Sequence, residues 1–591
     1  MTTAPTDPAD PVLADDPERP EPVPPVPVGE DAGERRLRER LVAPPTLAAA
    51  GGALLCWFLS LMPSLLPRQP VNQAAISAVS AAFGLLVFGA LGAGIAALWR
   101  RQGWRTDPRW PLWGRLALIV DAAATISLGL VLWTVWQRDH REVMGMDALS
   151  GWSVIVVLVL SVVLLAVLVL LGRLLAAAVG WLDRRVGRRI VRPRWGRIAT
   201  AGIVVVTLGV VWNVFERQFV DWADTTFGLV DTTTPDGVEQ PTLASASGGP
   251  GSLVEWDTLG FQGRGFAGGA TPADEIAATA RPGVEVRDPI RVYVGLDSAD
   301  SVDERADIAV RELERTGAFD RSVLVVATAT GTGWINPVAA RAIEHLHGGD
   351  TAIVSQQYSF LPSWIAFLVD TGGASEAGVA LFDAVHARWS TLPADDRPTL
   401  VVFGESLGSF GAEAAFASDD GPGAGLADLT ARADGALLVG PTANNPLFSA
   451  LIDERDAGSP SWRPTYASQP GVRVANQVTD IDPDDPAWTG SRVLYLFHPT
   501  DAIGTWRPDH LWSSPDWLDD PRGVGVPDAA RWVPVISWVQ ESFDLMAGFS
   551  AVPGFGHDYT DAFVDAWAAV APPEGWTTDD TAALRAALAD R

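Results

Sequence analysis

The segment Leu400-Val-Val-Phe-Gly-Glu-Ser-Leu-Gly-Ser-Phe-Gly411 decides the fold expected for the C-terminal half of this chain. The apolar run from Thr399 to Phe403 is typical of a buried parallel strand, and the small residues from Ser409 to Ala417 favour a helix. Between these runs, Gly404-Glu-Ser-Leu-Gly408 matches G-x-S-x-G, in which small flanking residues allow a tight strand-to-helix turn. Such a turn exposes its serine hydroxyl above the sheet. We therefore expect Ser406 to be a nucleophile, with Gly404 and Gly408 completing a nucleophile elbow.

Strand-like and helix-like runs alternate on both sides of this segment. Strands are expected at 290–295, 322–329, 351–356, 399–403, 435–439 and 492–497. Helices are expected at 302–316, 337–346, 374–390 and 408–417. This alternation predicts βαβ units and a mostly parallel sheet with helices on both faces, as in an α/β-hydrolase fold, over residues 286–591. In an α/β domain without catalytic activity, the same motif would be a plain turn.

A serine hydroxyl attacks efficiently only when a base removes its proton and a third group orients that base. In the α/β-hydrolase fold the order along the chain is serine, acid, histidine. Three histidines follow Ser406: His498 ends an apolar run, His510 lies in a segment rich in Trp and Pro, and His557 lies in a late Gly-rich loop. The chain order predicts His557 as the base, and the alternative is a histidine of a surface loop.

The expected acid is Asp501. It follows the strand-like run 492–497, so it lies beyond the carboxyl edge of the sheet, where sites of open α/β sheets are found. The acidic residues between 480 and 485 belong to an irregular stretch that is expected to be solvated. Asp558 adjoins His557 in the sequence but is expected to point elsewhere.

An oxyanion formed at an attacked carbonyl needs two preorganised N–H donors. The residue after the nucleophile, Leu407, supplies one of them in this fold. The second donor is expected from Gly331 or Thr332, in the Gly-rich segment 330–334 that follows a predicted strand. This segment lacks the Lys of a P-loop and the spacing of a dinucleotide fingerprint, and a plain turn is its alternative role.

Composition excludes several other functions. The net charge of −28 argues against a nucleic-acid partner. Cys56 is the single cysteine, so no disulfide forms within the chain and no Cys-based metal site exists. His345 and His347 do not complete a ligand set. We expect neither a metal nor a cofactor.

The N-terminal part is predicted to be an all-α transmembrane bundle at 45–220. Five apolar segments approach the ~20 residues that cross a bilayer, at about 45–66, 74–99, 116–136, 153–172 and 198–216. Arginines gather before the first segment, after the second and after the fourth. The rule that positive charge stays inside therefore predicts a cytoplasmic N-terminus and an extracytoplasmic C-terminal domain.

The remaining segments are assigned by composition. Residues 1–44 are Pro-rich and acidic, which predicts a disordered cytoplasmic tail. Residues 221–285 are rich in Gly, Thr, Ser and Pro, which predicts a linker into the C-terminal domain. Insertions near 442–480 and 504–548 fall where a lid would lie. The second insertion is rich in tryptophan, which suggests an apolar entrance to the site.

Several motifs together resemble one family, the α/β-hydrolase-like membrane proteins of bacteria, found widely in actinobacteria. They are Trp256-Asp-Thr-Leu-Gly-Phe-Gln-Gly-Arg-Gly-Phe266, Gly331-Thr-Gly-Trp-Ile-Asn-Pro337, Gln356-Gln-Tyr-Ser-Phe-Leu-Pro-Ser-Trp364, Gly404-Glu-Ser-Leu-Gly408 and Pro553-Gly-Phe-Gly-His557. The resemblance covers nearly all of the chain after residue 40. It implies a multi-span N-terminal domain in the bacterial cell membrane and esterase-like or lipase-like serine chemistry, with no settled substrate. This chain has Thr500-Asp-Ala-Ile503 where the family tends to show Ser-Asp-Pro-Ile, so Asp501 is kept and only the rigidity of its loop differs.

The sequence thus predicts a membrane-anchored serine hydrolase. Its partners would be the lipid bilayer and an ester substrate that is lipidic or belongs to the cell envelope. Two alternatives fit the same residues. The acyl group could pass to an envelope alcohol instead of water, or the hydrolase-like domain could be a non-catalytic binding part of an envelope or transport system.

Overall fold

The computed structural model describes residues 46–104, 110–182, 228–362, 365–366 and 371–589, with four single positions between 202 and 218. Contacts divide the chain into two units. Residues 45–168 and 202–591 form one of them, and residues 1–44 and 169–201 form the other. Every contact between the N-terminal helices and the C-terminal domain that is described below lies within the first of these units.

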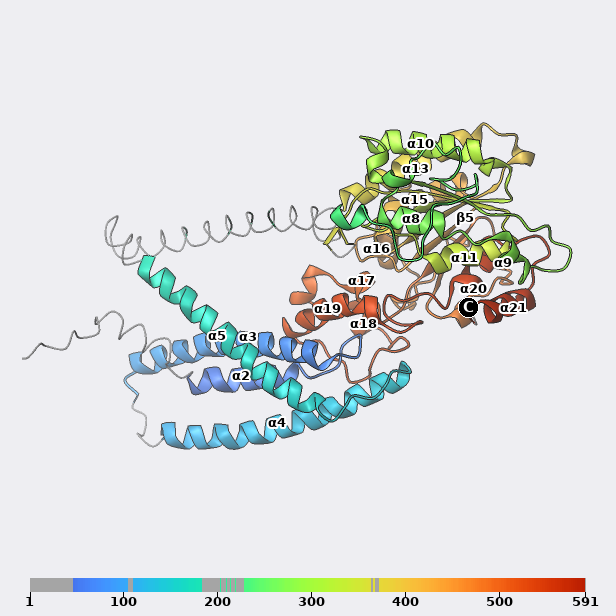
Figure 1. The fold of residues 1–591 in the computed structure, drawn as a ribbon. Coiled ribbons are helices and arrows are strands. Elements are labelled where there is room, and N and C mark those ends of the chain that lie inside the picture. The colour runs from blue at the N-terminus through green and yellow to red at the C-terminus, as the bar shows by residue number, and fades with distance from the viewer. Residues whose placement is uncertain are drawn as a thin grey trace, which may run out of the picture. The chain divides into compact units, whose positions relative to one another are not determined.

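The C-terminal domain is built on a seven-stranded sheet in which every strand pair is parallel (Figure 1). The strand order is β1-β3-β2-β4-β5-β7-β6. The strands are β1 Ile290–Val294, β2 Val323–Thr328, β3 Thr351–Gln356, β4 Thr399–Glu405, β5 Gly435–Val439, β6 Val472–Ala475 and β7 Arg492–Leu496. Nearly all their residues are buried, as expected for a parallel sheet covered on both faces. The predicted α/β-hydrolase architecture is confirmed.

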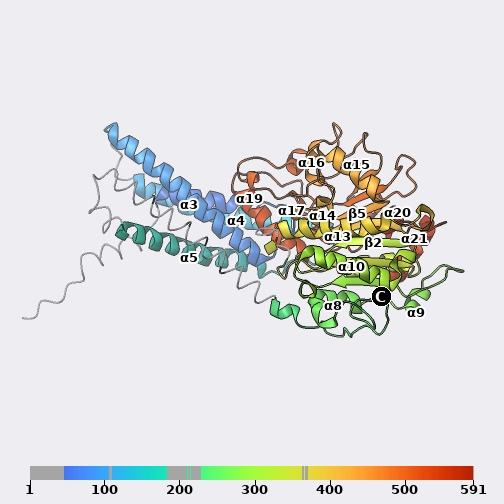
Figure 2. The ribbon, with the colours of Figure 1, turned by 90° about the horizontal axis from the view of Figure 1, so that it is seen from above.

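Helices cover both faces of this sheet (Figures 1 and 2). On one face, α13 packs against α10 and α14, and on the other α11 packs against α20. The helices of the domain are α10 Val302–Thr316, α11 Pro337–Leu346, α13 Gly372–Ser390, α14 Leu407–Ala414, α15 Pro422–Arg432, α20 Phe563–Val570 and α21 Thr578–Ala589. The four predicted helices correspond to α10, α11, α13 and α14. The helix α14 begins directly after Ser406 and so places that residue at the carboxyl end of β4.

The segment predicted as a linker is partly a packed component of the domain. It contains α8 Gly260–Gly268 and α9 Ala273–Ala277. Phe266 and Ile276 are buried, and Ala246 forms a parallel bridge with Arg291 of the edge strand β1. Small residues allow this part to pack closely against the sheet. Gly263, for example, lies so close to Tyr293 that a Cβ would approach its ring to 2.4 Å.

Among the described residues of the N-terminal region, three helices are long and apolar enough to cross a membrane. These are α3 Pro70–Arg101, α4 Trp110–Val143 and α5 Ser153–Leu182. The first predicted span contains a shorter helix, α2 Leu47–Leu59, of 13 residues. The fifth predicted span, at 198–216, lies outside the continuously described residues, as does the tail 1–44. Helices α2 and α3 approach closely at Gly52 and Gly84, where a Cβ on Gly84 would lie 2.3 Å from the Gly52 carbonyl oxygen.

Both predicted insertions contain short elements. The first carries α16 Phe448–Asp453 and the edge strand β6. The second carries α17 Ala502–Thr505 at its start, α18 Asp516–Asp519 and α19 Ile536–Ala547. The helix α19 also contacts α3.

Candidate active site

Ser406 occupies a strained turn between β4 and α14. Its backbone has φ 56° and ψ −125°, a conformation that residues other than glycine rarely adopt. Its N–H donates to the Val439 carbonyl at 2.8 Å, which ties the turn to the neighbouring strand β5. A Cβ on Gly404 would lie 2.4 Å from the Gly408 carbonyl oxygen, and one on Gly408 would lie 2.3 Å from the Thr328 carbonyl oxygen. The three residues therefore form a strained strand-to-helix turn that leaves no room for a side chain at either glycine.

His557 and Asp501 are in direct contact. His557 Nδ1 lies 2.7 Å from Asp501 Oδ2, and both side chains are buried. The same Oδ2 accepts a hydrogen bond from the Tyr559 hydroxyl at 2.8 Å, and Oδ1 accepts one from the Ile503 N–H at 2.9 Å. Because an ionised carboxylate only accepts, the proton of His557 lies on Nδ1, which leaves Nε2 as the basic nitrogen.

The free nitrogen of His557 is held in a defined place. Nε2 is buried and has no hydrogen-bond partner among the described residues. Gly440, with φ 51°, allows the ring to approach so closely that a Cβ there would lie 2.5 Å from Cε1. Burial lowers the pKa of His557, but the nearby Asp501 and Glu405 carboxylates outweigh it and the net pKa is raised.

Ser406 and His557 line one cavity of about 430 Å³. In this conformation they are not hydrogen-bonded to each other, since Nε2 has no partner. Such bonds are often long before substrate binds. The lining residues come from α8, the predicted donor loop, the segment after β3, the elbow and the segment that carries His557: Gln262, Thr330, Thr332, Trp334, Asn336, Pro362, Glu405, Ser406, Phe549, His557, Asp558 and Thr560.

The predicted donor loop lies at this cavity. Thr330 and Gly333 close a tight turn, in which the Gly333 N–H donates to the Thr330 carbonyl at 2.8 Å. The Tyr293 hydroxyl donates to the Gly333 carbonyl at 2.7 Å and fixes the turn from below. Thr332 lines the cavity, and Gly331 precedes it in the same turn. Leu407 is the first residue of α14, so its N–H belongs to the helix N-terminus beside Ser406.

Glu405 is a residue of the cavity whose importance the sequence did not reveal, although it stands inside the motif. Its side chain is buried, and Oε2 accepts a hydrogen bond from Asn336 Nδ2 at 2.9 Å. Burial raises the pKa of Glu405 to about 7, against the lowering effects of His557 and Asn336. With Asp558 it gives the cavity two carboxyl groups, while no arginine or lysine is among the described lining residues.

His498 and Tyr559 pack next to His557 and Asp501. Their rings stack with centroids 4.0 Å apart, and the His498 N–H donates to the Tyr559 hydroxyl oxygen at 3.1 Å. His498 Nδ1 lies 3.0 Å from the Gly556 carbonyl oxygen. Burial lowers the pKa of His498 to about 4, so this ring is neutral at pH 7 and donates to that carbonyl. The sequence signal for this role is weak, because it depends on contacts between residues about 60 positions apart.

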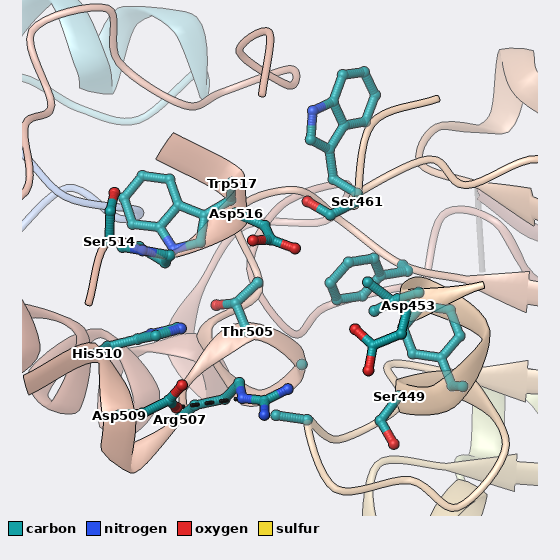
Figure 3. Close-up of a pocket in the computed structure, with 17 residues that line it drawn as sticks. Ser449, Asp453, Ser461, Thr505, Arg507, Asp509, His510, Ser514, Asp516 and Trp517 are labelled. Carbon is teal, nitrogen blue, oxygen red and sulfur yellow. Dashed lines mark hydrogen bonds and ion pairs between the residues drawn. The ribbon is translucent and has the colours of Figure 1, made fainter. Parts of the chain in front are cut away.

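A second pocket, of about 260 Å³, lies between the two insertions (Figure 3). Ser449, Asp453 and Ser461 border it from the first insertion, and residues between Thr505 and Trp517 border it from the second. Arg507 and Asp509 pair with each other at its rim. Neither Ser406 nor His557 lines this pocket, so it is separate from the candidate active site.

The described residues contain no group of three or more His, Cys, Asp or Glu side chains that could hold a metal ion.

Comparison with known proteins agrees with the two-part organisation. Residues 290–584 match a family described as the alpha/beta-hydrolase family, and residues 61–270 match the N-terminal region of the same family. No curated protein and no solved structure matches the chain. The chain therefore belongs to the alpha/beta-hydrolase family and carries the N-terminal region characteristic of that family together with its hydrolase domain.

Proposed function

We propose that this protein is a membrane-anchored serine hydrolase that cleaves a carboxylic ester through an acyl-Ser406 intermediate. One observation carries the proposal. The His557 ring is hydrogen-bonded to Asp501 through Nδ1, its Nε2 has no partner among the described residues, and His557 lines the same cavity as the strained Ser406. A serine, a base with one free nitrogen and an orienting carboxylate are the parts that nucleophilic acyl transfer requires.

In the proposed mechanism, His557 Nε2 takes the proton of Ser406 Oγ as this oxygen attacks the ester carbonyl. Asp501 holds the ring and stabilises the imidazolium that forms. The oxyanion is stabilised by the Leu407 N–H and by an N–H of the Gly331–Thr332 turn. His557 then protonates the leaving alcohol. In the second half of the reaction, His557 takes a proton from the water that attacks the acyl-enzyme, and it returns a proton to Ser406 Oγ as the acid leaves.

The lining of the cavity supports an uncharged or cationic ester as substrate. Trp334, Pro362 and Phe549 supply apolar surface, while Glu405 and Asp558 repel anionic groups. An ester of a lipid or of the cell envelope fits this surface and the attachment to a membrane. Its acyl chain would lie against the apolar residues.

The proposed topology has a cytoplasmic N-terminus and an extracytoplasmic hydrolase domain. Two segments that join the N-terminal helices, residues 60–69 and 144–146, share contacts with the hydrolase domain. Both are poor in arginine, whereas the opposite end of α3 carries Arg100 and Arg101. This arrangement is the one expected if the arginine-rich ends remain inside the cell.

The experiment is the hydrolysis of uncharged acyl esters of increasing chain length by the purified full-length protein, with Ser406→Ala as control. Ester cleavage that disappears in the control supports the proposal. Adding an alcohol acceptor separates the two reactions of an acyl-enzyme, because a transferase forms a new ester and a hydrolase releases only acid. A folded protein with no Ser406-dependent product under either condition would instead be a non-catalytic binding component.

A further inference from the structure

The α2–α3 loop, residues 60–69, holds a buried arginine that the catalytic mechanism does not use. The Arg68 side chain is 3% exposed. Its guanidinium donates to the carbonyls of Ser60 and Met62 at 3.3 and 3.2 Å, to Gln73 Oε1 at 3.1 Å and to the Ser64 hydroxyl. Its Nε lies 3.8 Å from Asp544 Oδ1 of the helix α19. The four hydrogen-bond partners hold the loop itself in shape, and the ion pair with Asp544 links this buried charge to the hydrolase domain.

The helix α19 binds the loop through two side chains. Asp544 Oδ2 accepts a hydrogen bond from the Leu65 N–H at 3.0 Å. Gln540 Nε2 donates to the carbonyls of Ser60 and Met62 at 3.0 and 2.9 Å. Burial raises the pKa of Asp544 to about 6, and Arg68 opposes that rise. The loop backbone is therefore satisfied by the hydrolase domain instead of by water.

An apolar cluster continues the same contact. Leu65, Leu66 and Met144, from the N-terminal region, share one core with residues of the second insertion. The buried members from the insertion and its flanks are Ala502, Trp517, Leu518, Val526 and Ala530. Each region therefore buries apolar side chains of the other.

The contact leads directly to the catalytic histidine. The helix α19 ends at Ala547 and is followed by the segment 548–557, which carries His557. Within that segment the His557 N–H donates to the Gly548 carbonyl at 3.2 Å, and the Phe549 ring lies 5.3 Å from the His557 ring. Leu66 packs close to this segment, since a Cβ on Gly556 would lie 3.3 Å from Leu66 Cδ2.

Taken with the proposed function, on which this inference rests, the geometry points to the α2–α3 loop as a structural part of the active site. We propose that Arg68, with Asp544 and Gln540, positions the segment 548–557 so that His557 faces Ser406. The N-terminal region then does more than hold the enzyme at a membrane. It sets the place of the base, while the sheet sets the place of the nucleophile.

The test uses the full-length protein in detergent micelles and two variants of the contact. Arg68→Met leaves Asp544 buried without its ion pair. Gln540→Leu removes only two neutral hydrogen bonds. This smaller change should keep the protein folded even if Arg68→Met does not. The matched control is Arg291→Met, which breaks the buried pair between Arg291 Nε and Glu344 Oε1 at 2.6 Å, on the edge strand β1.

Two readouts separate positioning from general stability. The first is the rate at which a fluorophosphonate labels Ser406 in the folded protein, measured against pH. The second is hydrogen–deuterium exchange of the segment 548–557. We expect Arg68→Met to label about tenfold more slowly, because a small displacement of a catalytic group is costly. In this variant, the midpoint of the acid limb of the labelling-rate profile should move to lower pH, because the hydrogen bond between His557 and Asp501 is weakened. Hydrogen–deuterium exchange in 548–557 should become faster.

In Arg291→Met, the melting temperature should fall while the labelling rate, midpoint and exchange in 548–557 stay at wild-type values. Wild-type behaviour of both contact variants in both readouts overturns the inference. If the wild-type protein itself shows no Ser406-dependent labelling, the proposed function fails. The exchange measurement then still decides whether Arg68 positions the segment.

Discussion

The two sides of the active-site cavity are held in different ways. Ser406 lies between β4 and α14, and its backbone is bonded to β5, so regular elements of the sheet determine its position. His557 lies in an irregular segment that is held by Asp501, Tyr559 and His498 and, through α19, by the α2–α3 loop. The position of the proposed nucleophile is therefore specified locally, whereas that of the proposed base depends on contacts between segments far apart in the sequence. Substitutions on the two sides should therefore affect activity and stability in different ways.

The largest expected effect comes from removing the orienting group on the histidine side. Asp501→Asn should lower ester turnover by about 10⁴-fold, because an amide favours the wrong histidine tautomer. Folding should be retained, since the Ile503 N–H still finds an acceptor oxygen. Turnover of a chromogenic ester and circular dichroism measure the two quantities. A turnover within tenfold of wild type would show that Asp501 does not orient the base.

A steric change tests the serine side. Gly408→Ala should disrupt the elbow, because its Cβ would meet the Thr328 carbonyl at 2.3 Å and this backbone oxygen cannot move aside cheaply. A loss of about 1–3 kcal/mol of unfolding free energy is expected, as for other overpacked sites, together with loss of labelling. The matched control is Gly423→Ala in α15, where the nearest atom, Gln469 Nε2, is 3.7 Å from the new Cβ. Equal melting temperatures in the two variants would contradict the close packing of the elbow.

Glu405→Gln tests the electrostatics that both sides share. The native pKa of about 7 exceeds the ordinary 4.5, so the folded protein keeps a proton that the unfolded chain releases in this interval. The stabilising contribution of Glu405 is complete below pH 4.5 and is lost as the pH rises through 7. In the variant, the free energy of unfolding should fall less steeply between pH 5 and about 8 than in wild type. Denaturant melts at several pH values measure this slope.

The same variant should alter activity. Glu405 raises the pKa of His557, so its neutralisation should move the acid limb of the rate profile to lower pH. The rate of hydrolysis of anionic esters should also rise relative to that of neutral esters, because one of the two carboxyl groups of the cavity no longer repels them. An unchanged profile and unchanged charge preference would mean that Glu405 acts only in packing.

The smallest effect is expected for Tyr559→Phe. The variant loses one donor to Asp501 Oδ2 and the acceptor of the buried His498 N–H, while the hydrogen bond from His557 to Asp501 remains. About 1–3 kcal/mol of stability should be lost, and turnover should fall by less than tenfold. A thermal melt and a turnover assay check both values. A loss as large as that of Asp501→Asn would make Tyr559 a central member of the site.

The sequence predicted what local patterns determine. The strand β4, the elbow and the helix α14 follow from an apolar run, two glycines and a run of small residues, and the structure places them within a few positions of the prediction. His557 could be selected from chain order and Asp501 from its place after the strand-like run 492–497, and the structure brings the two into contact.

What the sequence could not predict depends on non-local packing. The edge strand β6 has four residues, Val472–Ala475, and its short alternating pattern does not stand out from the insertion around it. The role of Arg68 depends on Asp544, which is 476 positions away in the sequence. The packing of 254–276 against the sheet was likewise hidden by a composition that resembles a linker.

Covalent labelling shows directly whether Ser406 is a nucleophile that His557 activates. The folded full-length protein is treated with a fluorophosphonate, and the adduct is located by mass spectrometry in wild type, Ser406→Ala and His557→Ala. We predict a single adduct on Ser406 in wild type, none in Ser406→Ala, and a labelling rate at least about 10³-fold lower in His557→Ala. Folded wild-type protein without an adduct on Ser406 would contradict its proposed role as nucleophile. An adduct that forms at the same rate without His557 would contradict the proposed role of His557 as base.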